Sequence, residues 1–124
     1  DTDVLIDVER GGSSIEALGG DEDVAISVIT VSELLHGVHR AHGATRARRL
    51  AFVEHVLASL AAVPISTPVA RVHSEVHAGV AAAGRTIGAH DLWIAATALA
   101  HGFGVVTRNA RDFREVSGLR VVEA

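Results

Sequence analysis

The spacing of hydrophobic and polar residues predicts a chain in which short β-strands alternate with α-helices. The run 24–29, Val-Ala-Ile-Ser-Val-Ile, is rich in β-branched residues and predicts a buried strand. Two helices are expected after it, over 30–42 and 45–61, because their apolar residues recur at helical spacing. The other expected elements are a strand end running into a short helix over 1–18, a short strand or connector at 64–66, helices at 68–83 and 90–101, a strand at 105–107, a helical turn around Asp112 and a last strand at 119–122.

This alternation indicates the α/β class, with a parallel sheet and helices on both of its faces. The 124 residues predict a single domain over 1–124, because the chain is long enough for one core and too short for two. The most hydrophobic stretch, 92–100, predicts a buried helix. No apolar run reaches the roughly 18 residues of a membrane span, so we expect no membrane partner.

Composition narrows the chemistry that the chain can perform. Cysteine is absent, which excludes disulfides, thiolate-bound zinc and thiol catalysis. Lysine is absent as well, which excludes Schiff-base chemistry and the lysine of a phosphate-binding loop. The formal net charge of −4 argues against a protein that binds nucleic acid by overall charge alone. Any nucleic-acid function therefore needs local arginines together with acids that serve metal ions.

Four acidic residues fall at the predicted ends of strands or starts of helices. They are Asp1, Glu33, Asp91 and Asp112. In an open α/β sheet, strand ends and the following helix starts share one edge, so these carboxylates are expected to converge there. Clustered carboxylates repel one another, and a divalent cation removes that repulsion. Oxygen ligands without cysteine favour Mg²⁺ or Mn²⁺, which activate water and stabilise charge on a phosphodiester.

Each of these acids also has a purely structural interpretation. Thr30 and Glu33 match the capping box, in which a glutamate closes the start of a helix. Asp91 fits an N-cap or first-turn position, and Asp112 fits a turn aspartate. Spacing alone does not decide between these interpretations and a metal site.

Four segments together resemble the motifs of the PIN-domain family, in the family's order. They are Asp-Thr-Asp-Val-Leu-Ile at 1–6, Thr-Val-Ser-Glu-Leu-Leu-His-Gly at 30–37, His-Asp-Leu-Trp-Ile-Ala-Ala-Thr-Ala at 90–98 and Val-Thr-Arg-Asn-Ala-Arg-Asp-Phe at 106–113. They span nearly the whole chain. The chain thus resembles PIN-domain ribonucleases, in particular the VapC toxins of bacterial toxin–antitoxin modules.

The resemblance implies an α/β/α sandwich with a central parallel sheet. The first strand of that sheet is expected to be truncated, because the motif normally follows hydrophobic strand residues and none precedes Asp1. The resemblance also implies metal-dependent cleavage of single-stranded RNA with Mg²⁺ or Mn²⁺ as cofactor. In that scheme Asp1 and Asp91 bind the metal directly, and Glu33 and Asp112 act through water or a second ion. Thr107 and Asn109 support them as polar groups.

The resemblance further implies protein partners and a cytoplasmic location. A VapB-like antitoxin would lie along apolar helix grooves, and the toxin would form a homodimer. The candidate groove residues, which core packing explains as well, are Leu34, Leu35, Val53, Leu57 and Leu60. Arg85 and Arg108 lie in loops next to the acidic motifs and are expected to contact the RNA backbone.

Histidines also recur at helical spacing, at His36, His39 and His42 and again at His73 and His77. Two histidines four residues apart can chelate zinc, but His73-Ser-Glu-Val-His77 is not the zinc-protease motif, so we interpret these histidines as surface residues. Trp93 lies inside the apolar helix and is expected in the core.

Two rival functions come from other classes of protein. The first is a catalytically silent PIN-fold module that binds RNA or protein. The second is a haloacid-dehalogenase-like phosphatase, because Asp1-Thr-Asp3 resembles that family's Asp-x-Asp opening. The missing lysine and the missing late acidic pair argue against the phosphatase.

Overall fold

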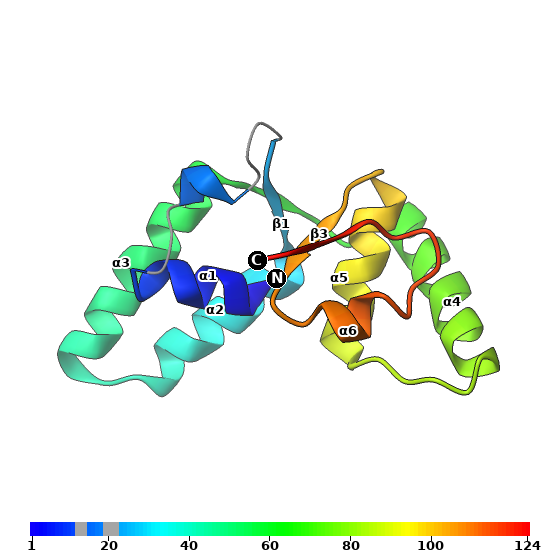
Figure 1. Cartoon of the computed structure of the whole chain (residues 1–124). Helices are drawn as coiled ribbons and strands as arrows, with labels where there is room; N and C mark the ends of the chain where they lie inside the picture. The colour runs from blue at the N-terminus through cyan, green and yellow to red at the C-terminus, as the bar shows by residue number, and fades with distance from the viewer. Residues whose placement is uncertain (12–14, 19–22) are drawn as a thin grey trace. The chain divides into compact units, whose positions relative to one another are not determined.

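The protein is described by a computed structural model that covers residues 1–11, 15–18 and 23–124 (Figure 1). The chain divides into two compact units, one formed by residues 2–63 and the other by Asp1 together with residues 64–124. Within the covered residues, no helix combines the length and the apolar character that crossing a membrane requires.

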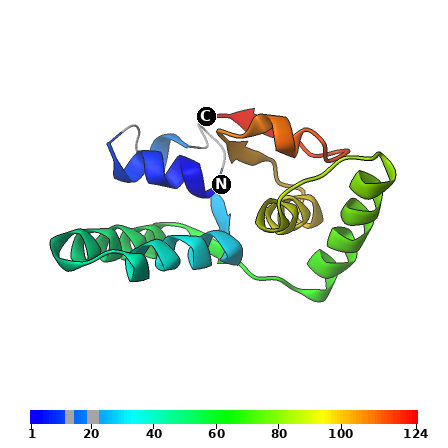
Figure 2. The ribbon, with the colours of Figure 1, turned by 90° about the horizontal axis from the view of Figure 1, so that it is seen from below.

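The unit of residues 2–63 packs helices around a two-stranded parallel sheet. Its elements are α1 (Thr2–Glu9), the 3₁₀ helix η1 (Ile15–Ala17), β1 (Ala25–Ser27), α2 (Val28–Arg40), α3 (Gly43–Ser59) and β2 (Ala61–Val63). β1 pairs with β2 in parallel, with Ala25 opposite Ala61. The helices α2 and α3 lie side by side as a hairpin (Figure 2).

The apolar faces of these elements form the core of this unit. Leu34, Val53 and Leu60 are buried in it, and Leu35 and Leu57 pack against it partly buried. Fully burying such a side chain stabilises the fold by roughly 1.5–3 kcal/mol. The five residues proposed from sequence as an antitoxin groove therefore serve the core. That was the alternative explanation for them.

The start of α2 differs from the prediction by two residues. Ser27 is the N-cap, and its hydroxyl oxygen accepts a hydrogen bond from the backbone N–H of Ile29 at 3.0 Å. Thr30 is consequently a buried residue of the first turn rather than a cap. The capping-box interpretation of Thr30 and Glu33 is therefore wrong, because the serine at the end of β1 caps the helix earlier.

The second unit is built around one buried helix. Its elements are α4 (Thr67–Ala82), α5 (Ala89–Ala100), β3 (Val105–Thr107), α6 (Ala110–Phe113) and β4 (Val121–Glu123). Leu92 and residues 94–98 of α5 are buried, as predicted for this stretch. The helix packs along α4 (Figure 1) and contacts β3, which pairs with β4 in parallel with Val105 opposite Val121. Both described strand pairs are parallel, as the α/β prediction requires.

Some predicted strand boundaries differ from the structure. The strand after α3 is Ala61–Val63, because α3 ends at Ser59 and leaves those three residues to pair with β1. Residues 64–66 form the connector that the sequence allowed as the alternative to a strand. The last strand is shifted to Val121–Glu123, because Leu119 is still in a turn, where its N–H donates to the carbonyl of Val116. Asp1 belongs to no strand, and α1 begins directly after it.

Candidate active site

Two hydrogen bonds hold Asp1 at the carboxyl end of β3. The hydroxyl of Thr107, which is completely buried, donates to the Oδ2 atom of Asp1 at 2.5 Å. The backbone nitrogen of Asp1 donates to the carbonyl oxygen of Val106 at 2.5 Å. The carboxylate of Asp1, which is partly exposed, is therefore fixed at the edge where ligands bind in α/β folds.

The same threonine connects Asp1 with a second acid of the predicted quartet. Its Oγ1 atom accepts a hydrogen bond from the backbone N–H of Asn109 at 2.8 Å. The side-chain amide of Asn109 donates to the Oδ2 atom of Asp112 at 2.8 Å. Asp1, Thr107, Asn109 and Asp112 thus form one continuous network. The structure brings together two predicted acids and the two polar groups predicted to support them.

Asp91 lies at the start of the buried helix, as predicted, but it is not the N-cap. Gly88 is the N-cap, and Asp91 is the third residue of α5. The carboxylate lies close to the start of the helix, since a Cβ atom on Gly88 would be 3.9 Å from the Oδ2 atom of Asp91. The helix dipole favours a negative charge at this place. The interpretation of Asp91 as a first-turn residue therefore holds, and it is compatible with a role of Asp91 in metal binding.

Glu33 belongs to the other unit, where it is bound by a residue that sequence reasoning assigned no role. The hydroxyl of Thr2 donates to the Oε1 atom of Glu33 at 2.8 Å, and it lies 3.5 Å from the hydroxyl of Thr30. The Thr at the second position of the first motif was the signal that could have identified this contact. The role of Glu33 in a common site with the other acids stays a prediction.

The side chains of these residues suit a hard divalent cation by their chemistry. Their donor atoms are carboxylate, hydroxyl and amide oxygens, which Mg²⁺ and Mn²⁺ prefer. Within the covered residues, no three or more His, Cys, Asp or Glu side chains are gathered as a metal site. Mg²⁺ is commonly bound by one or two carboxylates, with water and substrate phosphates completing its shell. The residues present fit that open kind of site rather than a closed cage.

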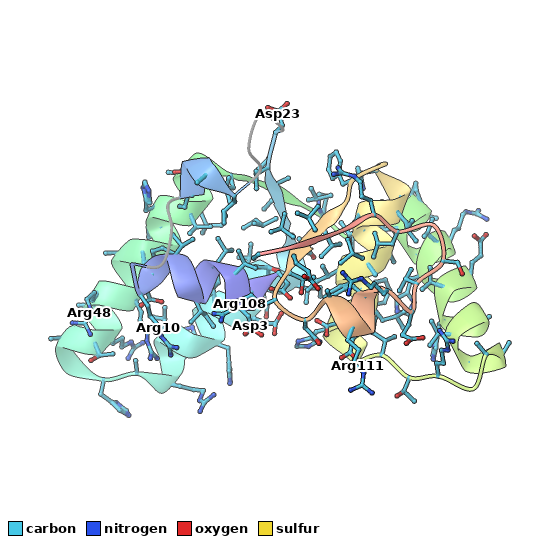
Figure 3. The ribbon with its side chains drawn as sticks, in the orientation of Figure 1. Asp3, Arg10, Asp23, Arg48, Arg108 and Arg111 are labelled. Atoms are coloured by element: carbon cyan, nitrogen blue, oxygen red, sulfur yellow. The ribbon has the colours of Figure 1, made fainter. Side chains whose placement is uncertain are left out.

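Three arginines lie close in sequence to these acids. The guanidinium of Arg85 donates to the carboxylate of Glu115. Arg108, next to Thr107, and Arg111, which projects away from α6, are both exposed (Figure 3). Arg108 and Arg111 therefore present positive charge on the surface of the segment that carries Asn109 and Asp112.

Among the described residues, these histidines belong to no group of three or more metal-ligating side chains, but one of them has a specific environment. The ring of His73 stacks on Trp93, with centroids 3.6 Å apart and 16° between the planes, and His77 meets it edge-on at 6.0 Å. Trp93 is only partly buried, so it borders the core and is covered by His73. Burial and the neighbouring His77 lower the pKa of His73 below its ordinary value of 6.5.

Comparison with known proteins decides the family. The PIN domain model matches residues 1–119. The chain belongs to the PIN domain family. Ribonuclease VapC5 of Mycobacterium tuberculosis is 38% identical over 124 residues, covering 99% of this chain and 90% of the relative. Ribonuclease VapC1 of Rickettsia felis is 34% identical over 123 residues, covering 98% of this chain and 92% of the relative.

A solved structure extends the similarity to the whole fold. It is VapBC-5 from Mycobacterium tuberculosis, a member of the VapBC family of toxin–antitoxin systems. The TM-score is 0.81 at 33% sequence identity, and the match covers 100% of this chain and 95% of that chain. The PIN fold predicted from the four motifs is confirmed.

Membership of this family makes the protein a nuclease, an enzyme that hydrolyses phosphodiester bonds. Nucleases of the PIN-domain VapC group generally depend on divalent metal ions. The phosphatase alternative, which rested on Asp1 and Asp3 alone, has no support from these similarities.

Proposed function

We propose that this PIN-domain protein is a Mg²⁺- or Mn²⁺-dependent endoribonuclease and the toxin of a VapBC-type pair. The observation that carries the proposal is the hydrogen-bonded network from Asp1 through Thr107 and Asn109 to Asp112, which connects acids from opposite ends of the chain. Relatives named ribonucleases, similar over nearly their whole length, support RNA as the substrate class.

The proposed roles follow the place of each carboxylate. Asp1 and Asp91 bind the metal ion directly, and Glu33 and Asp112 act through water or at a second ion. A bound ion would lower the pKa of water and neutralise charge on the phosphodiester. Thr107 orients the Asp1 carboxylate and Asn109 orients that of Asp112, so less freedom is lost when the ion binds.

Substrate binding is proposed to rest on the RNA backbone. Arg108 is exposed one residue beyond Thr107, and a guanidinium forms strong bidentate bonds with phosphate. The chain has one Trp, three Phe and no Tyr, so stacking of bases on aromatic rings contributes little. The protein therefore recognises its RNA mainly through shape and phosphates.

Titration of Mg²⁺ with a 5′-labelled single-stranded RNA tests this function. The proposal predicts cleavage that EDTA blocks and that excess Mg²⁺ restores. Binding of the RNA without cleavage at any metal concentration would identify the silent-module alternative and overturn the proposal.

We also propose a VapB-like antitoxin partner, a homodimer and a cytoplasmic location, where RNA substrates and an antitoxin are both present. Similarity to a VapBC complex supports the partner. Because the five apolar residues first considered for the groove serve the core, the antitoxin surface is not assigned to them. Co-expression with the neighbouring gene should yield a stable complex, and purification of this chain as a monomer would contradict both the partner and the dimer.

A further inference from the structure

We propose that Arg85 and Glu115 form a tether that positions Asp91 relative to Asp112, which makes both tether members positioning residues. The inference rests on the proposed nuclease function. Its basis is an ion pair between residues 30 positions apart, in which the Arg85 guanidinium donates to the Glu115 carboxylate. Each partner lies on a short segment next to one of these acids.

The backbone of Arg85 is fixed at the end of α4. Gly84 adopts a φ of +69°, which favours glycine, and its N–H donates to the carbonyl of Ala81 at 3.0 Å. The N–H of Arg85 donates to the carbonyl of Val80 at 3.0 Å, which completes a Schellman motif. Only residues 86–88 separate Arg85 from α5, whose third residue is Asp91. The position of Arg85 therefore limits where this loop can place the start of α5.

Glu115 lies on the turn that follows Asp112. Its N–H donates to the carbonyl of Asp112 at 3.2 Å. The residues on either side of this turn, Phe113 and Val116, are buried, with exposed fractions of 0% and 3%. The turn is thus anchored in the core, and its carboxylate reaches Arg85 from a fixed place. The ion pair joins the segment before Asp91 to the turn after Asp112.

The exposure of the pair indicates a local effect rather than a large contribution to stability. The side chains of Arg85 and Glu115 are 58% and 27% exposed. Ion pairs this exposed contribute little to global stability because water and salt screen them. A tether that restrains one short loop can still change the spacing of two carboxylates. The competing role for Arg85 is direct contact with an RNA phosphate.

A charge-swap experiment separates these two roles. The variants are Arg85→Glu, Glu115→Arg and the double variant with both changes, and Glu115→Gln serves as a milder single change. Arg114 and Glu123 form a second exposed ion pair at 3.1 Å, so Arg114→Glu with Glu123→Arg is the matched control. The readouts are kcat and KM for RNA, amide hydrogen exchange over residues 86–92, and the urea midpoint.

The tether predicts that each single change lowers kcat about threefold at constant KM, the size expected when one exposed ion pair is lost. It also predicts faster amide exchange over 86–92 in the single variants. The double swap should restore both values, while the control pair changes neither and all urea midpoints stay close to wild type.

Two results would overturn the tether. The first is a raised KM in Arg85→Glu that the swap does not restore, which would identify Arg85 as an RNA contact. The second is wild-type kcat and exchange in every single variant. If the wild-type protein cleaves no RNA, the nuclease proposal fails, and amide exchange alone then decides whether the tether exists.

Discussion

The hydroxyl of Thr107 donates a hydrogen bond to the carboxylate of Asp1, a residue 106 positions away in the sequence. Thr107 is completely buried, so the donor hydroxyl of this bond is shielded from competing water. It joins the first residue of the PIN pattern to the pattern's last motif within one unit of the structure. The proposed metal site depends on contacts of this kind, which hold carboxylates in place before an ion arrives.

Replacing Thr107 with valine tests this contact directly. Thr107→Val keeps the shape of the side chain but removes the donor to Asp1 and the acceptor for the N–H of Asn109. We expect a loss of about 1–3 kcal/mol in the free energy of unfolding and about a 10- to 100-fold loss in metal affinity. Urea unfolding and metal titration measure the two effects. Thr107→Ser keeps the hydroxyl and should retain metal affinity, and equal affinity in both variants would refute the role of the hydrogen bond.

Asp91→Asn removes the negative charge from the start of α5 while keeping the shape of the side chain. Because Asp91 is proposed as a direct ligand, metal-dependent cleavage should fall by more than about 100-fold, beyond the effect of removing a supporting residue. Circular dichroism should show an intact fold. Asp23→Asn, at an exposed acid without an assigned role, is the control and should cleave normally. Full activity of Asp91→Asn would reject the assignment.

Asn109→Ala leaves Asp112 without the amide that donates to its carboxylate at 2.8 Å. The carboxylate then rotates more freely, so we expect the cleavage rate at low Mg²⁺ to fall about tenfold. High Mg²⁺ should recover part of this loss, because the variant weakens binding rather than removing a ligand. A rate that stays unchanged across the Mg²⁺ titration would show that Asn109 does not support the site.

The lowered pKa of His73 predicts that the free energy of unfolding depends on pH. Its pKa in the folded chain is lowered, first by burial and then by His77, so the folded state binds fewer protons than the unfolded state just below pH 6.5. The stability it contributes is present above 6.5 and is lost as the pH falls through the lowered folded pKa.

His73→Phe keeps a ring over Trp93 but cannot titrate, so the variant should lose this part of the acid sensitivity. The measurement is the urea midpoint at a series of pH values, followed by the fluorescence of the single tryptophan. The wild type, measured at the same pH values, is the control. Identical pH dependence in the two proteins would contradict the prediction.

The sequence predicted most of the fold because local signals and tertiary packing agree there. The apolar run of α5 and the β-branched residues of β3 lie where periodicity and composition placed them. Predictions failed where two residues compete for one role. Both Ser27 and Thr30 can cap a helix, and only the end of β1 decides that Ser27 does so. In a second kind of case, one residue fits two roles. Leu34 and Val53 each fit either an antitoxin groove or the core, and their burial in the folded unit decides for the core.

The candidate site was predictable as a set of motifs but not as a set of contacts. The resemblance identified Thr107 and Asn109 as polar partners, and the structure supplies the atoms that they contact. Nothing in the sequence pairs Arg85 with Glu115, because that contact depends on how the end of α4 meets the turn after α6. Long-range pairs of side chains follow from packing, which periodicity does not encode.

Binding of Mn²⁺ to the purified protein, followed by electron paramagnetic resonance of the free ion, tests the central claim most directly. The claim is that carboxylates from distant motifs hold one hard divalent cation. We predict that the wild type binds Mn²⁺ and that Asp1→Asn and Asp91→Asn each weaken binding at least about tenfold. Equal Mn²⁺ binding by the wild type and both variants would contradict the account.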